Sequence, residues 1–172
     1  MHSAGRIIAV CMSPTEGGPI KTVTEAVAIA GEGLKGDRYR ATGASSKTQL
    51  TLIESEVIDA LNRELAKPLP VTAFRRNLVT EGVFLNSLVG VTFGVGEVQV
   101  QGIELCEPCA YLQDLLDVPD LVKRLTHKGG LRCEILEGGL IVTGVQTCAL
   151  PILPSFNTNC SAGHLTVCLV SH

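Results

Sequence analysis

The chain has 172 residues, of which 45% are hydrophobic and 18% are charged, and its formal net charge is -3. A chain of this length can bury a hydrophobic core without disulfides or a structural metal, and one domain is expected. The acidic balance argues against a nucleic-acid-binding protein, whose surface would be basic. No apolar run approaches the ~20 residues of a membrane span, and the N-terminus lacks a signal-like apolar segment, so we expect a cytoplasmic protein without a membrane partner.

Short β-rich segments separated by turn signals predict a series of strands along the chain. In chain order these strands are expected at residues 6–11, 22–30, 49–53, 91–93, 97–101, 103–105, 133–136 and 140–141, with 91–93 and 97–101 forming a hairpin. A helix is predicted over residues 54–65, where hydrophobic side chains recur every four positions. A short helix is predicted over residues 119–125, with a proline in its first turn. Many short strands with few helices predict an α+β fold, centred on a β-barrel with a few short helices.

The C-terminal part of the chain has an unusual composition. Residues 142–172 contain no Asp, Glu, Lys or Arg, and residues 142–152 resemble the translated reading frame of a common sequencing adaptor. We therefore predict a domain over residues 1–141 and a non-native, frame-shifted tail over residues 142–172. A genuine uncharged pair of strands is the alternative.

The seven cysteines are an odd number, which argues against a complete disulfide framework and for reduced thiols. Two of them form a tight motif, Cys106-Glu107-Pro108-Cys109, directly after a predicted strand. Pro108 removes a backbone donor and stiffens the turn between the two thiols. The motif is therefore the first candidate for chemistry.

Several interpretations of this motif compete. A thioredoxin-like dithiol would need a helix to open at the motif within a βαβ pattern, and only a weak helical run follows, at residues 112–118. A zinc site would use Cys106, Cys109, His127 and Cys133, although their spacing matches no compact zinc motif. The thiols could instead provide a soft ligand for a transition metal, or carry sulfur. Two buried, inert cysteines are the structural alternative.

Three polar loops carry positively charged side chains. Residues 33–39 carry Lys35 and Arg38, residues 74–78 carry two arginines and an amide, and residues 128–132 carry Lys128 and Arg132. Guanidinium groups and the backbone N–H groups of glycine loops suit phosphate and polar ring edges. Together the loops predict a pocket for an anionic ligand, where they would favour the thiolate form of a nearby cysteine.

An ordered series of short motifs over residues 7–141 resembles the MOSC domain family, named for the C-terminal domain of molybdenum cofactor sulfurase. The chain is most similar to the small stand-alone bacterial members. The motifs are Gly33-x-x-Gly36-Asp37-Arg38, Gln49 to Glu54, Arg75-Arg76-Asn77-Leu78, Gly82-x-x-Leu85-Asn86-x-Leu88, Phe93-x-x-Gly96, Cys106-x-Pro108-Cys109 and Gly129-Gly130-Leu131-Arg132. Each motif is common by itself, and the series in this order is specific.

The resemblance implies a β-barrel like that of pyruvate kinase and a site for the molybdenum cofactor, a pterin dithiolene with a terminal phosphate. It implies that Cys109 is the catalytic residue, as molybdenum ligand or persulfide carrier, and that Cys106 is a second thiol near the metal. The implied cofactor contacts are Arg76 and Asn77 on the pterin side, Lys35, Arg38 and Arg132 for the anion, and Asp37 and Arg75 in the same loops.

The function implied by the resemblance is the reduction of small N-hydroxylated compounds by oxygen transfer to a molybdenum held by Cys109. A separate electron-donor protein is expected, because the sequence has no flavin or iron–sulfur motif. One alternative is a non-catalytic carrier of the molybdenum pterin or of a persulfide, for which a cysteine desulfurase, a pyridoxal-phosphate enzyme, would be the partner. Another is a small zinc-stabilised domain.

Overall fold

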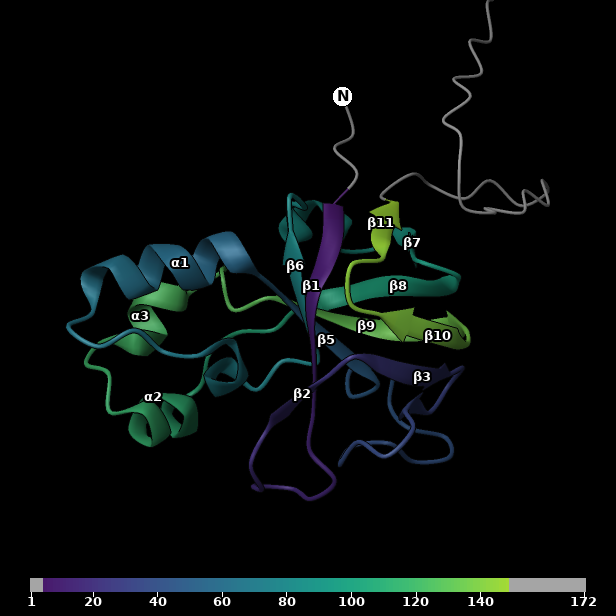
Figure 1. The fold of residues 1–172 in the computed structure, drawn as a ribbon, viewed down its shortest axis with the longest axis horizontal. Coiled ribbons are helices and arrows are strands. Elements are labelled where there is room, and N and C mark those ends of the chain that lie inside the picture. The colour runs from purple at the N-terminus through teal and green to yellow at the C-terminus, as the bar shows by residue number, and fades with distance from the viewer. Residues whose placement is uncertain (1–4, 149–172) are drawn as a thin grey trace, which may run out of the picture.

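One sheet closes on itself in the computed structural model, which describes residues 5–148 (Figure 1). The ring runs in the order β11-β7-β8-β9-β5-β6-β1, and β1 pairs again with β11. Only β5 and β6 pair in parallel within the described ring, so the barrel is mixed. The strands are β1 (Gly5–Met12), β5 (Leu50–Glu54), β6 (Leu78–Glu81), β7 (Thr92–Val95), β8 (Val98–Leu105), β9 (Leu131–Glu137) and β11 (Gln146–Cys148). The predicted α+β fold centred on a β-barrel is confirmed.

The predicted strand over residues 22–30 is wrong, because the chain changes sheet inside it. β2 (Lys21–Val23) pairs with β1 at the edge of the barrel sheet, whereas β3 (Glu25–Ile29) lies in a separate antiparallel sheet. That second sheet runs in the order β10-β3-β4, with β10 (Gly139–Val142) and β4 (Gly33–Leu34). A continuous β-rich pattern cannot show that its two halves have different partners.

Alternation of side chains along the strands fills the barrel. In β8, Val98 and Val100 are fully buried, whereas Gln99 and Gln101 between them are only half-buried. The β7–β8 hairpin is confirmed, and its turn contains Gly96 in the left-handed region (φ 59°). A Cβ at Gly96 would lie 2.6 Å from a methyl group of Val145, so the turn needs glycine for space as well as for conformation.

The helices gather on one side of the barrel, opposite β3 and β10 (Figure 1). They are α1 (Ser55–Glu64), α2 (Ala110–Leu116) and α3 (Leu121–Leu125), and the short 3-10 turn η1 (Val71–Phe74) packs with them. A second 3-10 turn, η2 (Leu85–Leu88), packs into the barrel core instead. α1 matches the helix predicted over residues 54–65, and α3 begins two residues later than predicted. Within the described residues, no helix combines the length and apolarity needed to cross a bilayer.

A second hydrophobic core joins the helices to the barrel. Ile58 and Leu61 of α1 pack in one cluster with Leu121 of α3. Phe74 and Ile53 belong to the same cluster, so the Ile53 side chain of β5 points out of the barrel toward the helices. The largest of these side chains are fully buried. This core therefore fixes where the segments between the barrel strands and the helices lie.

The described part of the predicted tail, residues 142–148, takes part in both sheets. β10 ends at Val142, one residue beyond the predicted boundary, and Thr147 of β11 pairs with both Gly5 and Val95. Residues 149–172, which include Cys160 and Cys168, lie outside the described residues. The non-native origin of residues 142–172 stays a prediction.

Thr147 suggests a stabilising substitution. Its side chain is 1% exposed, and its hydroxyl has no hydrogen-bond partner among the described residues. Since an unpaired buried hydroxyl opposes folding, we expect Thr147→Val to raise the free energy of unfolding by about 1 kcal/mol in urea titrations. Thr80→Val is the matched control, because the buried Thr80 hydroxyl donates to the Ile53 carbonyl (3.3 Å) and its loss should destabilise. Equal effects of the two substitutions would contradict this prediction.

Candidate functional site

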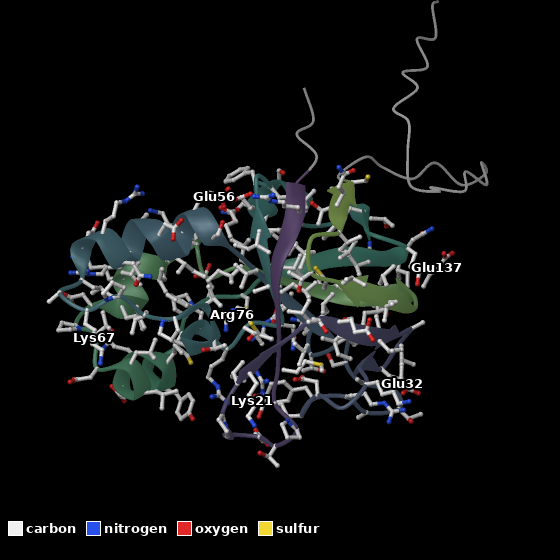
Figure 2. The ribbon with its side chains drawn as sticks, in the orientation of Figure 1. Lys21, Glu32, Glu56, Lys67, Arg76 and Glu137 are labelled. Carbon is white, nitrogen blue, oxygen red and sulfur yellow. The ribbon has the colours of Figure 1, made fainter. Side chains whose placement is uncertain are left out.

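A cavity of about 360 Å³ opens between the barrel and the helices. This volume lies within the range of small-molecule sites. Figure 2 shows one of its lining residues, Arg76, near the centre of the molecule, where the strands meet the helical side. The cavity is lined by Arg38, Tyr39, Thr48, Thr51, Arg75, Arg76, Cys106, Glu107, Cys109, Tyr111, Leu112 and Arg132.

The lining is strongly basic, although the chain is acidic overall. The lining contains four arginines and a single carboxylate-bearing residue, Glu107. Each of the three cation-bearing loops found in the sequence contributes at least one of these arginines. The cavity therefore has the charge that an anionic ligand requires.

The Arg38 side chain is almost fully buried, with 4% of its surface exposed. Its Nη1 donates to the Asp37 carboxylate (3.3 Å), its Nη2 donates to the Arg75 carbonyl (3.2 Å), and its guanidinium lies 4.6 Å from the centre of the Tyr39 ring. Its Nε is buried without a hydrogen-bond partner among the described residues. Arg38 is therefore held between the Asp37 carboxylate and the Arg75 backbone at the cavity wall.

Three predicted contact residues do not line the cavity. Lys35 is exposed, and Asp37 instead orients the loop, since its carboxylate accepts from the Ser13 N–H (3.2 Å) as well as from Arg38. Asn77 is buried, and its side chain accepts two hydrogen bonds from Thr51 and donates one to the Cys11 carbonyl. Asn77 therefore joins β5 to β1 next to the cavity.

The remaining arginines hold backbone segments that surround the cavity. Arg75 is in the left-handed region (φ 59°) where η1 ends, and its Nη2 donates to the Gly18 carbonyl (3.2 Å). Arg132 of β9 donates to the Lys47 carbonyl (2.9 Å), and its Nε lies 3.8 Å from the Glu104 carboxylate. Both side chains thus approach the cavity from loops or strands distant in sequence.

The two thiols of the motif have different surroundings. Cys106 follows β8 and is 2% exposed, and its N–H donates to the Gly130 carbonyl (2.7 Å). Cys109 is exposed, and α2 begins at the next residue, with the N–H groups of Leu112 and Gln113 donating to the Cys109 carbonyl. Cys109 is therefore the accessible thiol at the cavity.

The thioredoxin-like interpretation fails on topology rather than on the absence of a helix. A helix does open directly after Cys109, contrary to the weak run expected at residues 112–118. However, β8 and β9, on either side of α2 and α3, pair in an antiparallel manner. A βαβ unit requires parallel strands, so this motif belongs to another architecture.

The predicted zinc ligands are not assembled. His127 is exposed and binds Glu107 through both its N–H (2.8 Å) and its Nδ1 (2.8 Å), and the backbone bond lowers the pKa of that carboxyl. Cys133 is fully buried in β9, and burial raises the pKa of its thiol. In the part of the chain that the structure describes, no three His, Cys, Asp or Glu residues lie close enough to hold a metal by themselves.

Several lining residues are not among those predicted from the sequence. Glu107 stands inside the thiol motif, and Tyr39 follows Arg38, so neighbourhood in the sequence could have indicated both. Tyr111 and Leu112 line the cavity from the first turn of α2. The hydrophobic pattern of so short a helix does not show which of its residues face the cavity. Thr51 lies in β5 and Thr48 lies just before it, and no motif in the sequence marks either residue.

The family model of the MOSC domain matches residues 36–146. The chain belongs to the MOSC domain family. This family is associated with the molybdenum cofactor, and the matched residues include all four cavity arginines and both thiols of the motif. No curated protein matches the chain.

Solved structures share the MOSC fold. The YuaD protein from Bacillus subtilis superposes with a TM-score of 0.70 at 18% identity, over 84% of this chain and 94% of that chain. YiiM from Geobacillus stearothermophilus gives 0.67 at 21% identity, over 85% and 75%. YiiM from Escherichia coli gives 0.67 at 21% identity, over 87% and 72%. At these identities the likeness concerns the fold.

The contacts of Asn77 lead to a test of its role. We expect Asn77→Ala to lower the free energy of unfolding by about 3 kcal/mol, because it leaves buried backbone groups of β5 and β1 without their partner. Urea unfolding measures this, with Asn86→Ala as the control, since the Asn86 side chain makes one exposed hydrogen bond to the His127 carbonyl. A loss below about 1 kcal/mol for Asn77→Ala would contradict the structural role.

Proposed function

We propose that this MOSC domain binds the molybdenum cofactor in the arginine-lined cavity and reduces N-hydroxylated compounds, with Cys109 as the metal ligand. The observation that carries this proposal is an exposed Cys109 thiol beside a cavity with four arginines and one carboxylate.

The residues present fit such a cofactor. Arg38, Arg75 and Arg132 would hold the phosphate and the polar edges of the pterin, since guanidinium groups donate in pairs to planar and tetrahedral oxygen groups. Cys109 would offer the soft thiolate that molybdenum accepts. When bound, the cofactor supplies a metal that takes up the oxygen of the N–O bond in a two-electron change.

The chain's own residues would bind and orient the reactants. Tyr39 and Tyr111 line the cavity while remaining exposed, so they form an aromatic border through which a small substrate would pass. Electrons are expected from a separate donor protein, because the sequence has no flavin or iron–sulfur motif. These residues therefore divide into an anion-binding floor, a metal-binding thiol and an aromatic entrance.

Replacement of Cys109 tests the proposal. Wild type and Cys109→Ala are purified after expression with the cofactor supplied. We expect the molybdenum content of Cys109→Ala to be at least tenfold lower than that of the wild type, and its activity in reducing N-hydroxylamines to be lost. Cys148→Ala is the matched control, because Cys148 is also exposed but lies in β11. Elemental analysis and a reduction assay give the readouts. Equal molybdenum in both variants would contradict the role of Cys109, and molybdenum without turnover in the wild type would favour the carrier alternative.

The anion-binding role of the arginines has its own test. We expect Arg75→Gln to weaken retention of the cofactor about tenfold or more, since one charge-assisted hydrogen bond contributes roughly 1.5–3 kcal/mol. Arg124→Gln serves as the control, because Arg124 pairs with Glu64 on the surface of α3 (3.3 Å). The molybdenum and phosphorus that remain after gel filtration are measured for each variant. Identical retention in the two variants would show that the cavity charge is irrelevant to binding.

A further inference from the structure

Arg76 joins three segments around the turn that carries Cys109. Its Nε donates to the Gly129 carbonyl (2.9 Å), its Nη1 to the Phe74 carbonyl (3.2 Å) and its Nη2 to the Cys106 carbonyl (3.2 Å). These carbonyls lie in η1, at the start of the thiol turn and in the loop before β9. Arg76 is therefore bonded to both sides of the contact between the turn and that loop.

The shape of the guanidinium explains why arginine occupies this position. Arginine has five N–H groups in one rigid plane, whereas a lysine ammonium is a compact group on a flexible stem. Three carbonyls in separate segments can be reached together from the planar group. Burial opposes this charge and lowers the pKa of the Arg76 guanidinium, so the three carbonyl bonds are what make the buried position tolerable.

Two glycines complete the contact from the other side. A Cβ at Gly129 would overlap the Cys106 carbonyl oxygen and would lie 3.1 Å from Cδ of Pro108. Gly129 does not have a positive φ, so its requirement for glycine is one of space alone. Gly130 has φ 110° and accepts the Cys106 N–H, and a Cβ there would overlap the Leu52 carbonyl. The turn can therefore lie this close to the loop only because Gly129 lacks a side chain, whereas Gly130 allows the loop to lie against Leu52 of β5.

We propose that Arg76, Gly129 and Gly130 form a clamp on residues 106–109 that determines where the Cys109 thiol lies in the cavity. Arg76 is then a positioning residue that acts through the Cys106 carbonyl, Gly129 leaves space for the thiol turn, and the Gly130 carbonyl holds the Cys106 N–H. Pro108 transmits the constraint, because its ring restricts the backbone between the clamped Cys106 and the accessible Cys109. The catalytic consequence rests on the proposed function, whereas the clamp itself does not.

Amide exchange in the metal-free protein tests the clamp directly. We expect Gly129→Ala and Arg76→Ala to accelerate hydrogen exchange of the Cys106 amide at least tenfold, while amides of β1 stay protected. Gly94→Ala is the matched control and should change exchange less than twofold, because its Cβ would meet no atom nearer than 3.7 Å and its φ is not positive. If Arg76→Ala does not fold, Gly129→Ala decides, because it preserves every charge. Unchanged exchange in Gly129→Ala would overturn the proposal.

A conservative variant separates the effect of the planar guanidinium group from the effect of its charge. We expect Arg76→Lys to exchange as fast as Arg76→Ala, because one ammonium cannot bridge the three carbonyls. Exchange at the wild-type rate in Arg76→Lys would mean that charge alone suffices, and it would overturn the positioning role.

Kinetics of the cofactor-loaded protein connect the clamp to function. Per bound molybdenum, we expect Gly129→Ala to lower kcat at least tenfold and to change KM for the substrate less than twofold, since the thiol is displaced while Tyr39 and Tyr111, which the substrate would pass, are unchanged. A raised KM with unchanged kcat would overturn the link to the thiol. If the wild type itself shows no turnover, the proposed function fails, and the exchange experiment still decides whether the clamp exists.

Discussion

The cavity depends on how four guanidinium groups are held around it. Like charges that line the same cavity repel each other, and each arginine is held by at least one backbone carbonyl. Those carbonyls belong to loops that are far apart in the chain, so the arginines that create the positive charge also hold the cavity walls together. An anionic ligand would relieve the remaining repulsion, which couples binding to the order of the site.

The two cysteines of one short motif differ because the turn between them crosses from core to surface. Cys106 is sealed at the end of β8, and Cys109 emerges where α2 begins. Glu107 is tied outward to His127, whereas Pro108 is buried against the glycine loop. The Cys109 thiol is therefore accessible while its neighbours in the motif are immobilised by ordinary hydrogen bonds and packing.

Local patterns predicted those elements whose partners are near in the chain. The 3.6-residue period of α1 and the alternation in β8 were sufficient, because both reflect which face of an element is buried. The residues 22–30 were misread as one strand, since β2 and β3 differ only in the strands that they pair with. In the predicted tail, Val142 of β10 pairs with Glu25 and Thr147 of β11 pairs with Gly5. Each partner lies more than 100 residues earlier in the chain, and composition cannot indicate such a pairing.

The sequence by itself determined the chemical types at the site: a proline-stiffened pair of thiols and three loops rich in cations. Only the tertiary structure decided their tasks, separating Asn77, which joins strands, from Arg75 and Arg132, which line the cavity. It also showed that Gly129 is needed for space against the thiol turn. The physical reason is that hydrogen-bond acceptors in these contacts are mostly backbone carbonyls, and every residue has one, so a sequence does not reveal which carbonyl a side chain will find.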